Sequence, residues 1–412
     1  MPRNVPLRTR VTPHTLVLTA AVALVLVVGL STLLPDGGSD RDATITPVTG
    51  QYVATTGAPG PGTLTPEARA EIDRVLAATP DRTLARTTAA AQADALVRCA
   101  EFEGQQYCLG RGWTTAPETE VQAGAATAVP SRALPEETTG DLTDADLLAQ
   151  RAALDPAERE AAERSELEAA ARSVAKVVLL RHQLLGEPLP DGFLVRHPEA
   201  RATTEEQQVA ARQSTAVRSK GIRDYPRRST VMKARRAAAQ ARTYWCGPAT
   251  MQMLAWGWTG DRRRQGHWAG RLGTTTSGSS ITEMVRVVNQ DTGWDRADRA
   301  GNYVALGISD WNFKQWMLLQ MRHVKDYRAP LVLHPILLKR YYPYLDDDAS
   351  GHFQVGRGYN KRGNKPADIG YLEPWNQQRF DPSEPYIKRV QWRSAYKSFR
   401  ANKAHPQQNL GV

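Results

Sequence analysis

Most motifs that mark a metal or nucleotide site are absent from these 412 residues. The chain has no His-Glu-x-x-His segment and no paired Cys-x-x-Cys motif, and His267, His323 and His334 show no metal-ligand spacing. Gly356 and Gly358 supply only a fragment of a phosphate-loop pattern, and they fall in a predicted strand rather than before a helix. We therefore expect no metal and no organic cofactor.

The chain also lacks a recognised nucleic-acid-binding motif, although its formal net charge is +10. The arginines are spread along the sequence, so the charge indicates attraction to acidic surfaces and carries no information about the fold. For an exported chain such surfaces are cell-wall polymers or anionic lipid headgroups, and we expect no nucleic-acid partner. The acidic triplet at residues 346–348 is better explained as a solvated loop than as a calcium site.

Only one stretch is hydrophobic enough to cross a bilayer, namely residues 15–34, which carry no charge and follow Arg3, Arg8 and Arg10. The basic residues precede this stretch, so the positive-inside rule places residues 1–14 in the cytoplasm. A cleaved signal peptide is the alternative, but the hydrophobic stretch is long for one and no clear cleavage site follows it. Under both interpretations the rest of the chain is exported, and we favour a single-pass anchor in the cell membrane.

The exported part divides by composition. Residues 35–65 are rich in Gly, Pro, Thr, Asp and Ser and read as a flexible linker, and residues 66–200 read as an Ala-rich, mainly helical module. Residues 201–230 are polar and basic and form a second linker. Nine of the ten tryptophans lie in residues 231–412, where alternating helical and extended patterns predict an α+β domain.

Helix signals in the module are clear at several points. Helices are expected to begin at Pro66 and after Thr143 and Asp155, the last one ending at Gly186. A further helix is expected over residues 89–99, a turn over 105–108 and a loop over 114–139. In the C-terminal domain we expect helices from Cys246 and over 280–288, and strands over 330–334, 351–359 and 369–372.

The three cysteines have different expected roles. In an oxidising compartment Cys99 and Cys108 are close enough in sequence to form a disulfide, which leaves Cys246 as an unpaired thiol. Cys246 precedes Gly-Pro at a predicted helix start, where peptide dipoles favour a thiolate. A buried inert cysteine is the alternative, which the neighbouring residues make the weaker explanation.

Other residues complete a thiol-dependent site. His352 opens a predicted strand and is the candidate base and acid, and Glu373 follows at a distance that allows return on the next antiparallel strand. The backbone N–H of Cys246 and the side-chain amide of Gln240 are the candidate donors to an oxyanion. Tyr341, Tyr342 and Tyr344 precede the histidine and either line a substrate groove or pack on the core.

The same residues carry a resemblance. From about residue 235 to 400 the chain resembles the bacteriocin-processing (double-glycine) branch of the papain-like cysteine peptidases, through the Gln before Cys-Gly-Pro-Ala, the Gly-His-Phe-x-Val segment and the acid-Pro-Trp segment. The resemblance implies a helical part carrying Cys246 as nucleophile, an antiparallel sheet carrying His352 as general base and acid, and Gln240 as oxyanion donor. The family has Asp where this chain has Glu373, so Asp381 and Asn376 are alternatives for the third member.

The sequence thus predicts a membrane-anchored, extracytoplasmic cysteine peptidase that acts on a peptide or protein through an acyl-thioester at Cys246. One alternative is a surface-binding or assembly protein that keeps the papain-like fold without turnover. Another is an amidase or transpeptidase that acts on cell-wall peptides through the same thiol.

Overall fold

The computed structural model describes residues 58–200, 220–362, 365–375, 390–393 and 395–412, and the structural statements below concern these residues. The predicted anchor over residues 15–34 and most of the predicted linker over 35–65 lie outside them. Within the described ranges, no helix has both the length and the hydrophobicity that a membrane span requires.

The first half of the described chain is built mainly from helices that begin where the sequence predicts. The side chains of Thr65, Thr88, Thr143 and Asp155 each accept a hydrogen bond from a backbone N–H of the first turn. Gly186, at φ +81°, ends the 30-residue helix α5 in the left-handed conformation that glycine tolerates best. The elements are α1 (Pro66–Leu76), α2 (Ala89–Leu96), β1 (Cys99–Phe102), β2 (Gln105–Cys108), β3 (Gly112–Thr114), α3 (Glu118–Ala126), α4 (Asp144–Ala153), α5 (Pro156–Leu185) and α6 (Phe193–Arg196).

Three local predictions in this half are wrong. The predicted helix over 89–99 ends at Leu96, and the predicted turn over 105–108 is strand β2, because the reversal occurs earlier, at Glu103 and Gly104 with positive φ. The predicted loop over 114–139 contains α3. The disulfide prediction is confirmed: Cys99 and Cys108 face each other across the β1–β2 pair and are bonded.

The second half alternates helices with the strands of the larger part of the sheet. The predicted helices at Cys246 and Ser280 and all three predicted strands are present, with bounds shifted by a few residues. The elements are β4 (Arg228–Thr230), α8 (Cys246–Thr259), α9 (Gln265–Leu272), α10 (Ile281–Asp291), β5 (Ala305–Leu306), α11 (Phe313–Lys325), β6 (Leu331–Leu333), β7 (Gln354–Arg362), β8 (Lys365–Leu372), β9 (Val390–Arg393), α12 (Tyr396–Ala401) and β10 (Leu410–Gly411).

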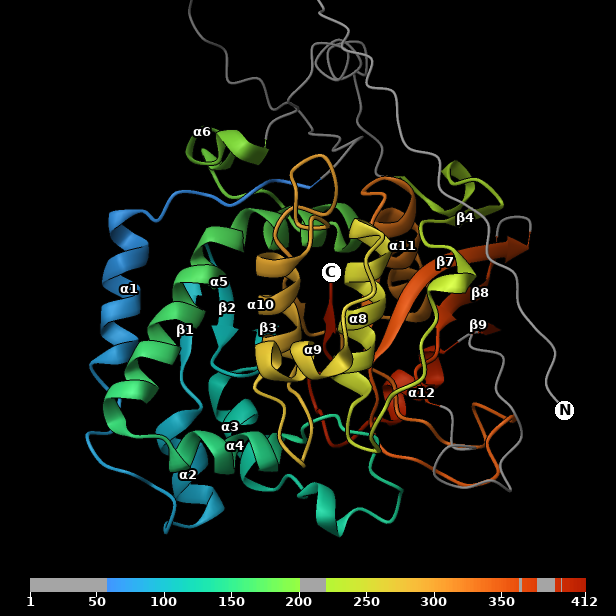
Figure 1. Cartoon of the computed structure of the whole chain (residues 1–412). Coiled ribbons are helices and arrows are strands. Elements are labelled where there is room, and N and C mark those ends of the chain that lie inside the picture. Colours follow the sequence, from blue (N-terminus) through green and yellow to red (C-terminus); the bar gives the residue numbers. More distant parts are fainter. Residues whose placement is uncertain (1–57, 201–219, 363–364, 376–389, 394) are drawn as a thin grey trace, which may run out of the picture. The chain divides into compact units, whose positions relative to one another are not determined.

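The strands of both halves form one mixed sheet, ordered β1-β2-β3-β5-β10-β6-β7-β8-β9, with β4 also paired to β7. The halves meet at the parallel pair β3–β5, where Trp113 lies opposite Leu306. β6, β7, β8 and β9 form an antiparallel meander, of which β7, β8 and β9 are labelled in Figure 1. The fold is therefore α+β, as predicted, and strands from the module extend the sheet of the C-terminal domain.

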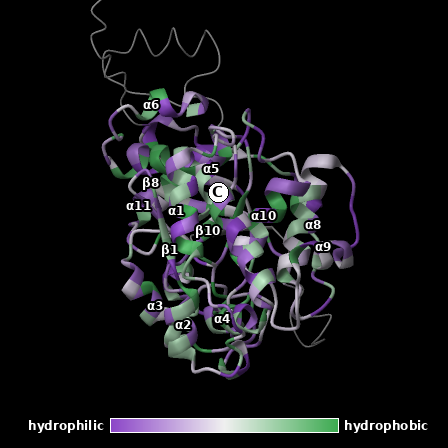
Figure 2. Ribbon diagram, turned by 90° about the vertical axis from the view of Figure 1, so that its left-hand side faces the viewer, coloured by the Kyte–Doolittle hydropathy of each residue, from purple (hydrophilic) through white to green (hydrophobic). Residues whose placement is uncertain are grey.

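Hydrophobic burial connects helices and sheet. Trp113, Trp268, Trp316 and Trp375 are almost completely buried, and a single hydrophobic cluster extends from α1 and α5 through α8, α10 and α11 to the central strands. Hydrophobic and hydrophilic stretches alternate along these helices (Figure 2), as expected for helices that bury one face. The start of α8 and the first residues before β7 lie inside this packing, which fixes the positions of the candidate site residues.

Candidate active site

Cys246 is the first residue of α8, with Gly247 and Pro248 in the first turn. Pro248 suits a first turn because the N–H it lacks would have no partner inside the helix. A Cβ on Gly247 would lie 2.6 Å from Ser279 Oγ, so only glycine allows this close approach to the loop before α10. The sequence therefore sets Cys246 at a helix N-terminus tightly packed against the segment that contains Ser279.

His352 and Glu373 meet where strands β7 and β8 leave the sheet. Val355 of β7 pairs with Leu372 of β8, so the residues just beyond that pair come together. His352 Nε2 lies 2.6 Å from Glu373 Oε1, and both side chains are fully buried. His352 Nδ1 has no hydrogen-bond partner among the described residues, so this nitrogen is free to exchange a proton with a reacting group.

The Glu373 carboxylate is held by four donors. Besides His352 it accepts hydrogen bonds from the side chains of Gln354 (2.6 Å) and Tyr344 (3.3 Å) and from the backbone N–H of Trp375 (2.8 Å). Tyr342 is buried and hydrogen-bonded to Ser398, so Tyr342 and Tyr344 belong to the packing around the carboxylate. The alternatives Asp381 and Asn376 lie outside the described residues.

Gln240 and the backbone of Cys246 point at the same atom. The Cys246 N–H donates to the carbonyl oxygen of Thr139 at 3.2 Å, and Gln240 Nε2 reaches that same oxygen at 3.1 Å while also contacting the carbonyl oxygens of Arg242 (3.0 Å) and Thr243 (2.6 Å). Two N–H donors that converge on one carbonyl oxygen are the arrangement that stabilises a developing oxyanion. The two donors that the sequence pairs are thus brought together in space, and in this structure a carbonyl from the same chain lies between them.

That carbonyl belongs to residues 137–142, a segment between α3 and α4 that we name the strap. On one side the strap is bonded to the residues before β7: Ser350 N–H donates to Glu137 O at 2.8 Å, and Thr139 Oγ1 donates to Gly351 O at 2.6 Å. On the other side, Ser279 N–H donates to Gly140 O at 3.0 Å. The strap therefore crosses the N-terminus of α8 between the histidine-bearing and the Ser279-bearing segments.

Glycines on both sides of the contact make the close fit of the strap possible. Gly140 has φ +106°, and a Cβ there would lie 2.2 Å from Tyr244 O. A Cβ on Gly278, also at φ +106°, would lie 2.0 Å from Gly140 O, and a Cβ on Gly351 would lie 1.8 Å from Asp141 Oδ2. No side chain larger than hydrogen is compatible with these distances. The strap and the segments packed against it are therefore complementary at three separate glycines.

The Cys246 thiol is fully buried beneath this segment. Burial raises its pKa well above the usual range, and the nearby carboxylate of Asp141 raises the pKa further. Hydrogen bonds from the backbone of Phe353 and Gly247 act in the opposite direction but are the smaller effect. The thiol in this closed arrangement is thus protonated at neutral pH, and a thiolate requires the strap and its charge to move away.

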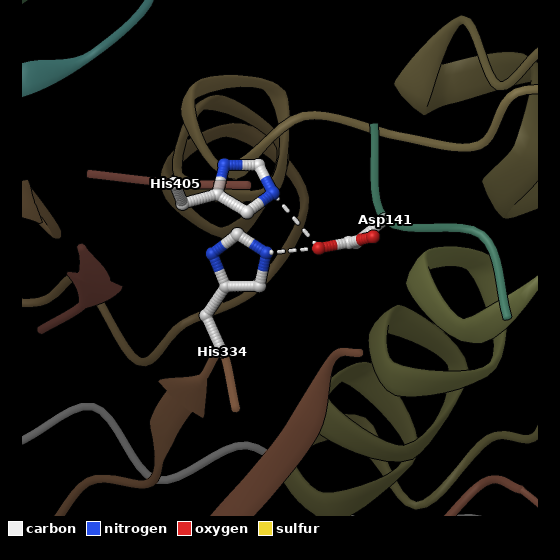
Figure 3. A group of neighbouring side chains, drawn as sticks. All are labelled: Asp141, His334 and His405. Carbon is white, nitrogen blue, oxygen red and sulfur yellow. Dashed lines mark hydrogen bonds and ion pairs between the residues drawn. The ribbon is translucent and has the colours of Figure 1, made fainter. Parts of the chain in front are cut away.

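Asp141 of the strap also belongs to a second group of buried side chains, shown in Figure 3. His334 Nε2 lies 2.9 Å and His405 Nε2 lies 2.8 Å from the same oxygen, Asp141 Oδ2. His334 follows β6, and His405 lies between α12 and β10, so three distant segments meet here. One donor atom from each of the three residues lies within 4.8 Å of the others, close enough to share a metal ion.

The side chains in this group strongly shift one another's pKa values. Burial acts to raise the pKa of Asp141, but the charges and hydrogen bonds of His405 and His334 lower it well below its usual range. Burial acts to lower the pKa of His405, whereas Asp141 and Asp144 raise it to about 9. His334 has a lowered pKa, because of burial and then the charge of His405.

Comparison with known protein families gives a match that fits this geometry. Residues 233–403 match the model of the Peptidase_C39 like family. The C-terminal part of the chain is a C39-like cysteine peptidase domain. It is accordingly a cysteine-type peptidase, which is a hydrolase. No curated protein and no solved structure gives a significant match to the chain.

The C39-like domain contains all four residues that the sequence selects, whereas the strap precedes the matched range. Thr139, Gly140 and Asp141 were not predicted, because a loop between two helices carries no sign of where it packs. His334 shows no metal-ligand spacing in the sequence, and no motif distinguishes His405. His405 and Asp141 are 264 positions apart, so no spacing rule connects them.

Proposed function

We propose that this protein is a membrane-anchored, extracytoplasmic peptidase that hydrolyses peptide bonds through an acyl-thioester at Cys246. The observation that supports this most strongly is the convergence of Cys246 N–H and Gln240 Nε2 on one carbonyl oxygen. An extended peptide whose carbonyl replaces that of Thr139 would place its carbonyl carbon beside the sulfur of the same residue that donates the N–H.

In this proposal each of the four residues has a defined part in the reaction. His352 takes the proton of Cys246 through Nδ1, and the thiolate attacks the carbonyl carbon while Gln240 and the Cys246 N–H bind the oxyanion. The imidazolium then protonates the leaving amine, and a water molecule hydrolyses the thioester with His352 again as base. Glu373 holds Nε2–H and stabilises the imidazolium that forms in both steps.

The location and partners extend the proposal beyond the site. Residues 15–34 would anchor the protein in the cell membrane with the C-terminal part outside it, and the substrate would be a peptide or protein at that surface. The net charge of +10 would favour cell-wall polymers as neighbours.

One observation favours the binding protein without turnover. Cys246 is fully buried, and its pKa is raised, which is the opposite of what a resting thiolate requires. If the strap stays in place under all conditions, the donors at the N-terminus of α8 never meet a substrate. The two functions differ in whether the thiol becomes reactive when the strap is displaced.

The test uses the purified full-length chain and its Gly140→Ala variant, in which the strap cannot occupy its closed position. Both are incubated with a library of extended peptides, and products are identified by mass spectrometry. We expect hydrolysis by the Gly140→Ala chain, and its loss when Cys246→Ser or His352→Asn is added. The matched control is His323→Gln, a buried histidine in α11 outside the site, which should keep the activity.

Two results would separate the alternatives. No hydrolysis and a thiol that stays unreactive towards iodoacetamide in the Gly140→Ala chain would favour the binding protein. Transfer of the acyl group to added amines or muropeptide fragments, in preference to hydrolysis of extended peptides, would favour the amidase or transpeptidase.

A further inference from the structure

The group around Asp141 contains a conflict between hydrogen-bond acceptors. His334 Nδ1 lies 3.0 Å from Asn409 Oδ1, and the orientation of that amide is fixed because Asn409 Nδ2 donates to Arg111 O at 3.2 Å. An amide oxygen only accepts, so His334 Nδ1 must carry the proton. In a neutral imidazole the other nitrogen, Nε2, is then a bare acceptor, yet it faces the carboxylate oxygen Asp141 Oδ2 at 2.9 Å.

His405 repeats the pattern. Its Nδ1 faces Asp144 Oδ1 at 3.3 Å, and its Nε2 faces Asp141 Oδ2 at 2.8 Å. An ionised carboxylate only accepts, so this ring too has acceptors on both nitrogens. Protonating all four nitrogens would place two imidazolium rings with centroids 4.2 Å apart in a site where both side chains are buried. An imidazolium at His405 alone donates to both carboxylates but leaves His334 Nε2 facing Asp141 Oδ2 without a proton, so protons match every contact only if both rings are charged.

A divalent cation removes the conflict. Neutral imidazoles held by acceptors at Nδ1 present Nε2 lone pairs to a metal, and the carboxylate of Asp144 beside His405 is the kind of outer partner that ligating histidines commonly have. Ligand atoms at about 2.0–2.1 Å from a tetrahedral ion lie about 3.3 Å apart. The 2.8 and 2.9 Å separations from Asp141 Oδ2 need to open by only a few tenths of an ångström.

The chemistry of the three donors narrows the choice of metal. Two imidazole nitrogens and one carboxylate oxygen suit a transition metal and disfavour calcium or magnesium, which prefer sets made of oxygen alone. Zinc, commonly bound by three protein ligands of this kind with a fourth position left open, fits best. All three residues are at most 3% exposed, so the ligands are also shielded from bulk water.

We propose that Asp141, His334 and His405 bind one zinc ion, and that this ion fastens the strap over Cys246. Asp141 lies in the strap, two residues from Thr139, whereas His334 lies in the C39-like domain and His405 lies two residues after the matched range. An ion shared between them resists any motion that lifts Thr139 O away from the donors of Cys246 and Gln240. The proposed zinc binding does not depend on the proposed function, whereas its effect on access to the thiol rests on the proposed function of Cys246.

The first experiment measures metal in the full-length protein. The chain is stripped with EDTA, incubated with Zn²⁺, passed through a desalting column and analysed for bound metal, with Co²⁺ as a spectroscopic substitute. We expect one ion per chain, a visible Co²⁺ absorption, and a higher melting temperature with Zn²⁺. The His405→Gln variant should lose all three effects, and the His323→Gln control should keep them. A folded wild-type chain that holds no ion would overturn the proposal.

The second experiment measures the rate at which iodoacetamide labels Cys246, with Zn²⁺ and with EDTA. A coupling of the usual size would make labelling about tenfold slower with Zn²⁺. The His405→Gln chain should label at one rate under both conditions, which excludes direct binding of zinc to the thiol. Equal rates in a wild-type chain shown to hold zinc would overturn the fastening role. Neither readout needs turnover, so failure of the peptidase proposal would not be confused with failure of this one.

Discussion

Gly140→Ala should open the site, because the strap has no room for a side chain at this position. A Cβ on residue 140 would lie 2.2 Å from Tyr244 O and 2.3 Å from Tyr244 C, and both of these atoms belong to the backbone. At φ +106° an alanine is strained as well. The closed position is therefore lost, while residues outside the strap keep their packing.

The size of the effect follows from the contacts that hold the strap. Thr139 and Gly140 make five hydrogen bonds of 3.2 Å or less to the rest of the site. At about 1 kcal/mol net each, less about 1–2 kcal/mol of backbone entropy for each of the two ordered residues, the closed form is favoured by roughly 2 kcal/mol. Since 1.4 kcal/mol corresponds to a factor of ten, iodoacetamide should label the zinc-free Gly140→Ala chain roughly 30-fold faster than the zinc-free wild type.

The assay has a simple readout, because Cys99 and Cys108 are joined and Cys246 is the free thiol. Intact-mass spectrometry after timed quenching counts labelled chains directly. Gly186→Ala is the matched control: Gly186 also has positive φ, at +81°, but a Cβ there meets nothing within 4 Å. Equal labelling of the Gly140→Ala and wild-type chains, or equally fast labelling of the Gly186→Ala chain, would refute the reasoning.

Three further predictions concern catalysis and stability. Glu373→Gln removes the charge that orients His352, so kcat/KM should fall about 10²–10⁴-fold in peptide hydrolysis. An unchanged kcat/KM would show that Glu373 does not orient the histidine. Burial, and then a nearby lysine charge, lowers the pKa of His323 well below 6.5. The unfolded chain alone takes up that proton, so the unfolding free energy should fall by up to about 1.4 kcal/mol per pH unit below pH 6.5, and urea titrations of His323→Gln should show a smaller slope. Replacing both Cys99 and Cys108 by Ala should lower the unfolding free energy by about 2–3 kcal/mol, measured in the same way, with a smaller effect expected under reducing conditions.

The helices and the order of the site residues could be read from the sequence because their causes are local. Thr143 and Asp155 each precede a run of helix-forming residues, and their side chains cap the helix that follows. Gly186 ends a helix because glycine tolerates positive φ. Cys246 stands at a helix start for the same kind of reason. The separation of His352 and Glu373 fits one antiparallel strand pair, and β7 and β8 form that pair.

Errors arose where a distant partner decided the local structure. Residues 105–108 form a strand because β1 and β3 flank them, and the predicted loop before Thr139 contains α3. The placement of residues 137–142 across α8 depends on Gly140, Gly278 and Gly351 meeting in space, and no local pattern encodes that meeting.

By itself, the sequence determined the kind of chemistry, because a thiol at a helix start, a histidine before a strand and an acid after the next strand each leave a short pattern. Only the tertiary structure decided the state of the site. It placed the Thr139 carbonyl between the two oxyanion donors and set Asp141 against His334 and His405. These contacts join residues up to 264 positions apart, and hydrogen bonding and metal coordination act through distances in space, not along the chain.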